Sequence, residues 1–200
     1  MLTIYELKPR FQNLLRPLVV ALAHRGVTAN QITLLALFGS CAIGLLLVVT
    51  RDPRLFLLLP LWMFIRMALN AIDGMLAREF AQKSTFGGYL NELSDVISDT
   101  ALIIPFALFP PFSWPMVGAV VVVSIVTEMT GVLGMALGGQ RRYDGPMGKS
   151  DRAFVFGALG LWLGLAGALP LWARWIMLIV LLGLVISIIN RIKNGIASVK

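Results

Sequence analysis

Six long apolar stretches constrain the fold of this chain more than any other feature of its sequence. They fall at residues 31–50, 54–77, 88–111, 114–138, 153–169 and 170–190. Each is close to the roughly 20 apolar residues that a helix needs to cross the hydrocarbon core of a bilayer. With 58% hydrophobic and only 14% charged residues among 200, the chain is too apolar for a soluble domain. We therefore expect an all-α integral membrane protein with six transmembrane helices in one domain.

The basic residues between these stretches predict the orientation of the chain in the membrane. One side of the predicted helix bundle carries Lys8, Arg10, Arg16, Arg25, Arg78, Lys83, Arg141, Arg142, Lys149, Arg152, Arg191, Lys193 and Lys200, and the other carries only Arg51, Arg54 and Arg174. Because cytoplasmic loops carry an excess of Lys and Arg, we expect both termini in the cytoplasm. The net charge of +7 then indicates attraction to anionic lipid headgroups rather than to nucleic acid.

The segment before the first stretch has the pattern of a helix that lies along the membrane surface. Apolar residues recur at helical spacing, at Ile4, Leu7, Phe11, Leu14, Leu15, Leu18 and Leu22. Lysine and arginine occupy other positions of the same segment, as in amphipathic interfacial helices. We therefore divide the single domain, residues 1–200, into an interfacial helix over 1–26 and a six-helix bundle over 27–200.

Polar side chains follow one face of the second and third stretches. Arg66, Asn70, Asp73 and Ala77 form one such stripe, and Gly87, Asn91, Asp95 and Asp99 form the other. Residues three and four apart share a helix face, and ionisable groups in membrane helices normally face a bundle interior or a wet cavity. Carboxylate and carboxamide oxygens suit a hard cation such as magnesium. The two stripes therefore predict one shared, cation-binding site.

The spacing of these residues resembles the signature of the CDP-alcohol phosphatidyltransferase family. That signature reads D-x-x-D-G-x-x-A-R, eight residues, G-x-x-x-D-x-x-x-D, and the chain matches it at Asp73, Gly74, Ala77, Arg78, Gly87 and Asp95. Asn70 and Asn91 stand where the first and third aspartates of the signature belong. Within the family, the chain is similar to the bacterial YnbA-type members.

The resemblance implies a function in phospholipid synthesis in the bacterial inner (cytoplasmic) membrane. A homodimer would move a phosphatidyl group from CDP-diacylglycerol, or a related CDP-alcohol, to a small alcohol and release CMP. Asp95 matches the aspartate proposed as the general base of the family, while Asp73, Gly74, Ala77, Arg78 and Gly87, with Thr28 and Asn30, match nucleotide-binding positions. Mg²⁺ or Mn²⁺ would be held by Asn70, Asp73, Asn91 and Asp95, with Asp99, or less directly Glu92, restoring some of the missing negative charge.

Each of three groups of residues allows two interpretations. Thr28 and Asn30 precede the first stretch, where helix capping alone would explain them. Lys149 and Arg152 lie at a helix start and predict a binding site for a phosphate or a phosphorylated acceptor, although topological charge is the alternative. Arg66 lies deep in the second stretch and needs a buried carboxylate partner, for which Asp99 and Glu128 are the candidates.

The two asparagines also leave the reaction open. A carboxamide oxygen ligates magnesium but brings no charge, so an enzyme of the same fold that uses one metal, or another CDP-alcohol, is the first alternative. The second is a catalytically silent membrane protein that binds nucleotide or lipid. The third is a small transporter that uses Arg66, Asp99 and Glu128, which the absence of a convincing internal repeat disfavours.

Overall fold

The computed structural model describes the backbone of residues 4–198 and the side chains of residues 10–198, and all of its regular structure is helical. The elements are α1 (Ile4–His24), α2 (Ala29–Thr50), η1 (Pro53–Leu57), α3 (Leu58–Glu79), α4 (Thr85–Ile103), η2 (Ile104–Leu108), α5 (Trp114–Ala136), α6 (Lys149–Ala166), η3 (Leu171–Ala173) and α7 (Arg174–Ser198). The side chains of Ile4, Leu7 and Lys8, which carry part of the expected amphipathic pattern, lie outside the described residues, as does Lys200.

Four helical segments of the described chain are long and apolar enough to cross a membrane. They are Ala29–Thr50, Pro53–Glu79, Trp114–Ala136 and Leu171–Ser198. The expectation of an all-α membrane protein is therefore confirmed. The helices α4 and α6 are shorter, with 19 and 18 residues, and each carries charged side chains within its length. The count of six membrane-spanning helices stays a prediction.

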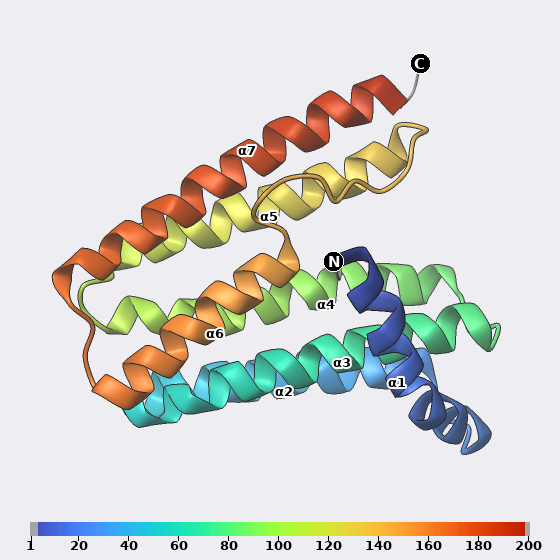
Figure 1. Ribbon diagram of the computed structural model, residues 1–200, viewed down its shortest axis with the longest axis horizontal. Helices are drawn as coiled ribbons and strands as arrows, with labels where there is room; N and C mark the ends of the chain where they lie inside the picture. Colours follow the sequence, from blue (N-terminus) through green and yellow to red (C-terminus); the bar gives the residue numbers. More distant parts are fainter. Residues whose placement is uncertain (1–3, 199–200) are drawn as a thin grey trace.

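The helices form two groups that run side by side (Figure 1). In the first group, α2 packs against both α3 and α4, and α6 packs against α3. In the second group, α5 packs along α7. The main apolar core lies toward the end of the bundle where η1 and η2 are found, and the rings of Phe56 and Phe106 meet there with centroids 4.9 Å apart. The polar residues of α3 and α4 lie toward the other end.

Small residues let the helices that carry the polar stripes approach closely. A Cβ atom at Gly44 of α2 would lie 2.2 Å from the carbonyl oxygen of Ala101, so α2 and α4 are in backbone contact there. A Cβ atom at Gly160 of α6 would lie 2.9 Å from the side chain of Leu59 in α3. Glycine at these positions permits the close packing that brings α4 and α6 to the same part of the bundle.

The first helix lies obliquely across α3 instead of joining the bundle (Figure 1). Buried Val19 packs in a small apolar cluster with Ile72 and Met75 of α3. Arg16 pairs with Glu79 at 2.5 Å, at the end of α3. These contacts hold α1 against the bundle, and its placement at the membrane surface stays a prediction.

The segment between α5 and α6 folds back into the bundle, so α6 begins part of the way along its neighbours (Figure 1). The N–H of Arg142 donates to the carbonyl of Gly131 in α5 at 3.0 Å, and the N–H of Met147 donates to Ser187 Oγ in α7 at 3.1 Å. Gly145 has a φ of +117°, and a Cβ atom there would lie 2.4 Å from Ser187. This fold-back delivers the first turn of α6 to the middle of α4.

Asp144 ties the same segment to the end of α7. Arg142 Nε donates to Asp144 Oδ2 and Asn194 Nδ2 donates to Asp144 Oδ1, both at 2.9 Å. Partial burial acts to raise the pKa of Asp144, but these hydrogen bonds outweigh it, so the pKa of Asp144 lies below its ordinary value. The ionised carboxylate therefore stabilises the fold-back.

Candidate functional site

The two polar stripes predicted from the sequence face each other across α3 and α4. Asn70 Nδ2 of α3 donates to Asp95 Oδ1 of α4 at 3.4 Å, which joins the two halves of the signature. Asp73 lies one turn further along α3, is buried, and accepts a hydrogen bond from Thr33 Oγ1 of α2 at 2.9 Å. Three helices therefore contribute to one polar centre.

Two basic side chains converge on Asp95. The Lys149 ammonium, from the first residue of α6, donates to Asp95 Oδ1. Arg66 Nη2 donates to the carbonyl oxygen of Asp95 at 3.0 Å and lies 3.5 Å from Oδ1. The contacts to the carboxylate of Asp95 all involve Oδ1. Its Oδ2 accepts no hydrogen bond from the described side chains. Asp95 thus keeps one oxygen for a further partner.

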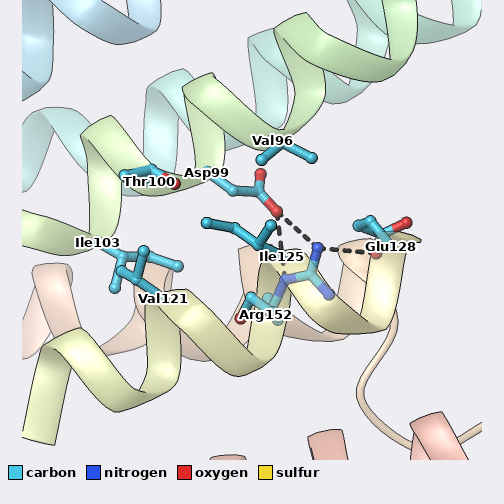
Figure 2. Close-up of a pocket in the computed structure, with 9 residues that line it drawn as sticks. Val96, Asp99, Thr100, Ile103, Val121, Ile125, Glu128 and Arg152 are labelled. Carbon is cyan, nitrogen blue, oxygen red and sulfur yellow. Dashed lines mark hydrogen bonds and ion pairs between the residues drawn. The ribbon is translucent and has the colours of Figure 1, made fainter. Parts of the chain in front are cut away.

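Asp99 lies one turn below Asp95, between two buried guanidinium groups. Arg66 Nη1 donates to Asp99 Oδ1, and Arg152 Nη2 donates to Asp99 Oδ2 at 2.7 Å. Figure 2 shows the guanidinium of Arg152 between the carboxylates of Asp99 and Glu128, and its Nη2 lies 3.0 Å from Glu128 Oε1. The expectation that Arg66 pairs with Asp99 or Glu128 is confirmed, with Asp99 as the partner. Direct metal ligation by Asp99 stays a prediction, since both of its oxygens contact arginines here.

The ion pairs continue from this centre toward the end of the bundle. Arg141 Nη2 lies 2.6 Å from Glu92 Oε2 of α4 and 3.3 Å from Glu128 Oε2 of α5, and Arg191 of α7 lies 3.5 Å from the same Glu128 oxygen. Arg191 Nη1 also donates to the carbonyl of Thr127 at 2.5 Å. The result is one connected network of four carboxylates and five basic side chains, formed by Glu92, Asp95, Asp99, Glu128, Arg66, Arg141, Lys149, Arg152 and Arg191.

The predicted phosphate-binding residues occupy different settings. The side chain of Arg152 is only 2% exposed and is held by Asp99 and Glu128. The side chain of Lys149 is 30% exposed and contacts Asp95. Of the two, Lys149 therefore has the freedom to meet a phosphate arriving from outside, whereas Arg152 is a buried part of the network.

The predicted nucleotide-binding residues gather at the start of α2 and the adjoining ends of α3 and α4. Thr28 caps α2: its Oγ1 accepts from the N–H of Gln31 at 3.3 Å, and its own N–H donates to Gln31 Oε1 at 2.9 Å. The capping expectation for Thr28 is therefore confirmed. A Cβ atom at Gly87 would lie 2.9 Å from Asn30 Oδ1, so the first turns of α2 and α4 touch at these two residues.

Gly74 makes room for the side chain of Arg78. A Cβ atom at Gly74 would lie 3.1 Å from Arg78 Nη2, so the guanidinium of Arg78 folds back over the glycine on the same helix face. Arg78 is exposed and Ala77 is half-buried. The glycine, the small alanine and the arginine together leave a surface that an anionic group can approach.

Sequence reasoning missed Thr33 as a partner of Asp73, and it treated Arg141 and Arg191 as topological charge alone. In the sequence, Thr33 lies in the segment that opens the first apolar stretch, where only Thr28 and Asn30 stood out as candidates. The structure shows its hydroxyl bonded both to the Ala29 carbonyl at 3.1 Å and to Asp73 at 2.9 Å. The signal for its role is that it lies one turn after Thr28 and Asn30, on the helix that faces the signature.

The kinds of oxygen donor that the signature supplies suit a divalent cation. Among the described residues, no group of three His, Cys, Asp or Glu side chains is placed to hold a metal ion. The remaining donors are the carboxylates of Asp73 and Asp95 with the carboxamides of Asn70 and Asn91, and a hard cation such as magnesium or manganese prefers oxygen ligands of both kinds. Two carboxylates match the charge of one divalent ion.

Sequence comparison identifies relatives along nearly the whole chain. The sequence model of a family described as CDP-alcohol phosphatidyltransferase matches residues 26–189. Inner membrane protein YnbA of Escherichia coli (strain K12) is 51% identical over 175 residues, which cover 87% of this chain and 85% of that protein. Archaetidylinositol phosphate synthase of Pyrococcus horikoshii is 28% identical over 113 residues, which cover 54% of this chain and 56% of that protein.

Solved structures share the fold. The phosphatidylinositol phosphate synthase PgsA1 of Mycobacterium tuberculosis with CDP-DAG bound superposes with a TM-score of 0.71 at 21% identity, covering 90% of this chain and 92% of that one. The same enzyme in complex with manganese and citrate gives a TM-score of 0.73 at 22% identity, covering 91% of this chain and 88% of that one.

Proposed function

The chain belongs to the CDP-alcohol phosphatidyltransferase family, and on that premise we propose that it transfers a phosphatidyl group from CDP-diacylglycerol, or a related CDP-alcohol, to a small alcohol. CMP is the other product. The CDP-DAG bound to a structural neighbour supports the donor. The observation that carries the proposal is the hydrogen bond from Asn70 to Asp95, because it brings both halves of the signature to one centre, with Lys149 beside them.

We propose that the membrane placement follows from the same family. All six helices from α2 to α7 cross the bilayer as one domain over residues 1–200, α1 lies at the interface, and both termini face the cytoplasm of a bacterial inner membrane. The name of the Escherichia coli relative supports the inner membrane. The protein acts as a homodimer. The nucleotide and the alcohol then enter from water, while the acyl chains of the donor stay in lipid.

We propose that Asp73, Asp95, Asn70 and Asn91 hold Mg²⁺ or Mn²⁺. The manganese complex of a structural neighbour supports a divalent ion of this kind. When bound, such an ion supplies positive charge that offsets the charge of the diphosphate and of the departing CMP. Thr33 orients Asp73 through its hydrogen bond of 2.9 Å.

In this proposal the residues of the chain mainly position groups and neutralise charge. The hydroxyl oxygen of the alcohol attacks the β-phosphorus, the bond from that phosphorus to the oxygen of CMP breaks, and the oxygen of Asp95 that is free of hydrogen bonds takes the hydroxyl proton. The Lys149 ammonium contacts a phosphate of the substrate. Gly74, Ala77, Arg78, Gly87, Thr28 and Asn30 border the nucleotide.

We propose that Arg152 and Asp99 position the site from below. Arg152 fixes Asp99 at 2.7 Å, Asp99 pairs with Arg66, and Arg66 donates to the carbonyl of Asp95 at 3.0 Å. Asp99 therefore contributes its charge to the site through Arg66. This chain of contacts gives both residues an effect on the reaction while they remain buried.

A direct test measures CMP release by the purified protein. Radiolabelled CDP-diacylglycerol is supplied with Mg²⁺ or Mn²⁺ and a panel of alcohols that includes glycerol 3-phosphate, serine, inositol phosphate and glycerol. The proposal requires CMP release that depends on one of these alcohols and stops when the cation is chelated. Undiminished release after thorough chelation would rule out the metal-assisted reaction. No release with any alcohol would favour a silent binding protein of the same fold.

A further inference from the structure

Lys149 holds an unusual position for a lysine beside a divalent-cation site. Its ammonium group donates to Oδ1 of Asp95, the same carboxylate that we propose as a metal ligand and base. Asn70, from the first half of the signature, donates to the same Asp95 oxygen at 3.4 Å. We infer that the Lys149 ammonium is a built-in cation of this site, and that the site consequently takes up a single divalent ion. The inference rests on the proposed function.

The residues before and after Lys149 in the sequence are anchored by hydrogen bonds. On one side, the N–H of Gly148 donates to Asp151 Oδ2 at 2.8 Å, which caps α6, and Met147 is anchored on Ser187. On the other side, Arg152 is buried and fixed to Asp99. The ammonium also projects from the N-terminus of an 18-residue helix, which carries partial positive charge of its own. These contacts anchor the backbone that carries Lys149, and they keep the positive charge of its side chain within reach of Asp95.

The charges of the donor set limit how many divalent ions can bind. Asn70 and Asn91 are neutral, so only Asp73 and Asp95 bring negative charge to the four-residue set. Lys149 offsets one of these charges, and the charge of Arg66, which is within 3.5 Å of the same Asp95 oxygen, is balanced by Asp99. One divalent ion already makes the centre positive, and a second would add two uncompensated charges in a half-buried setting. Such charges are costly where the effective dielectric constant is low.

The asparagines and the lysine are therefore parts of one arrangement. A site with four carboxylates, as in the family signature, could balance more positive charge than one ammonium group supplies. A site with only two carboxylates and no lysine would lack the cation that lies nearest to Asp95 here. Because the lysine is tethered, chelation removes the divalent ion and leaves the ammonium in the site. The position of Lys149, between Asp95 and the partly exposed surface, also lets it contact a substrate phosphate from the other side.

The test counts metal ions in the absence of substrate and does not need turnover. Purified full-length protein in detergent is titrated with Mn²⁺, and free Mn²⁺ is followed by electron paramagnetic resonance. The parent is expected to bind one Mn²⁺ per chain. Lys149→Met should bind Mn²⁺ on the order of tenfold more tightly because a repelling charge is gone. The triple variant Asn70→Asp, Asn91→Asp and Lys149→Met should bind two.

Matched variants separate the local effect from net charge and folding. Lys83→Met removes one positive charge from the exposed loop between α3 and α4, and it should leave Mn²⁺ affinity and stoichiometry as in the parent. Lys149→Arg keeps the charge and should still bind one ion. Circular dichroism reports whether each variant is folded. Two Mn²⁺ per chain in the parent would count against the inference even where a variant does not fold.

Two results would overturn the inference. One is two Mn²⁺ per chain in the parent, and the other is a folded Lys149→Met variant whose affinity matches that of the parent. Failure of the proposed function gives a different pattern. A parent that binds one Mn²⁺ but releases no CMP with any alcohol refutes the reaction and supports the tethered cation, whereas CMP release by a parent with two Mn²⁺ does the reverse.

Discussion

Asp99→Asn separates a buried ion-pair role from a direct metal-ligand role. The substitution removes the charge that pairs with Arg66 on one oxygen and with Arg152, at 2.7 Å, on the other. Both guanidinium groups are almost completely buried, with 3% and 2% of their side chains exposed. Removing one partner of a buried pair costs about 3–5 kcal/mol. Because the carboxamide keeps an acceptor oxygen and Glu128 still pairs with Arg152, we expect the low end, about 3 kcal/mol.

The assay is unfolding of the purified protein in mixed micelles, with helicity followed as the fraction of denaturing detergent rises. Asp52→Asn is the matched control, because Asp52 is exposed and its N-cap bond to the N–H of Arg54, at 2.9 Å, is one that asparagine makes equally well. The control should change the free energy of unfolding by less than about 0.5 kcal/mol. Mn²⁺ affinity should equal that of the parent in Asp52→Asn, and it should fall only modestly in Asp99→Asn, because Asp99 acts on the site through Arg66 and not as a ligand.

Two outcomes of this experiment would refute the reasoning. A cost of less than about 1 kcal/mol for Asp99→Asn would show that the buried network does not depend on this carboxylate. Parent-like stability with a clear loss of Mn²⁺ affinity would show that Asp99 acts as a ligand after all.

Three further predictions concern a hydrogen bond, a close approach and a pH-dependent anchor. Thr33→Val removes the hydroxyl that donates to the carboxylate of Asp73, and it should lower kcat/KM about fivefold, a loss of about 1 kcal/mol. Thr127→Val is the control: its hydroxyl bonds only within its own helix, so kcat/KM should not change. Gly74→Ala places a methyl group 3.1 Å from the guanidinium of Arg78, and it should raise KM for the CDP substrate because that side chain must move. Gly88→Ala, where a methyl group has no neighbour within 4 Å, should leave KM unchanged. Asp144 stabilises the fold above its unfolded-state pKa of about 4, and this contribution is lost as pH falls through the lower folded-state pKa. Unfolding measured between pH 6 and pH 3 should therefore show a shallower acid loss in Asp144→Asn, and equal slopes would contradict the assignment.

Much of the fold follows from local sequence pattern. The apolar stretch at 114–138 corresponds to α5 (Trp114–Ala136), and the stretch at 31–50 corresponds to α2 (Ala29–Thr50). The stretch at 88–111 is not one helix, because Pro105 lacks an N–H and the chain continues from α4 as η2 (Ile104–Leu108). The last helix extends beyond its apolar stretch to Ser198, since Arg191 and Asn194 find polar partners at the end of the bundle.

How far α6 reaches into the helix bundle depends on contacts between residues that are distant in the sequence, which local sequence patterns do not predict. The apolar stretch begins at residue 153, and α6 starts one turn earlier, at Lys149, where the sequence predicted a helix start for Lys149 and Arg152. Its start is placed by bonds from Arg142 to Gly131 and from Met147 to Ser187, which join residues 11 and 40 positions apart. The positive-inside rule predicts that Lys149 and Arg152 lie at the membrane surface. The fold-back instead brings them into the helix bundle, where they contact Asp95 and Asp99.

The site was predictable where helical periodicity governs it and unpredictable where distant segments meet. The spacing of Asn70 and Asp95 on two helix faces predicted that they would share a centre, and the depth of Arg66 predicted a carboxylate partner. The convergence of Lys149 and Arg152 on Asp95 and Asp99 joins residues more than 50 positions apart in the sequence. Such long-range pairing depends on how the helices pack, and single-sequence spacing does not encode it.

The most direct test of the account follows both products of the reaction with the same protein. CDP-diacylglycerol labelled in the cytidine and in the phosphatidyl group is incubated with the parent, Mg²⁺ or Mn²⁺ and the accepted alcohol, and CMP and the new phospholipid are quantified together. The parent should form equal amounts of the two products and Asp95→Asn should form neither, because that substitution removes the proton acceptor and a metal ligand. An Asp95→Asn variant that keeps full activity, or CMP released without a matching phospholipid, would contradict the account.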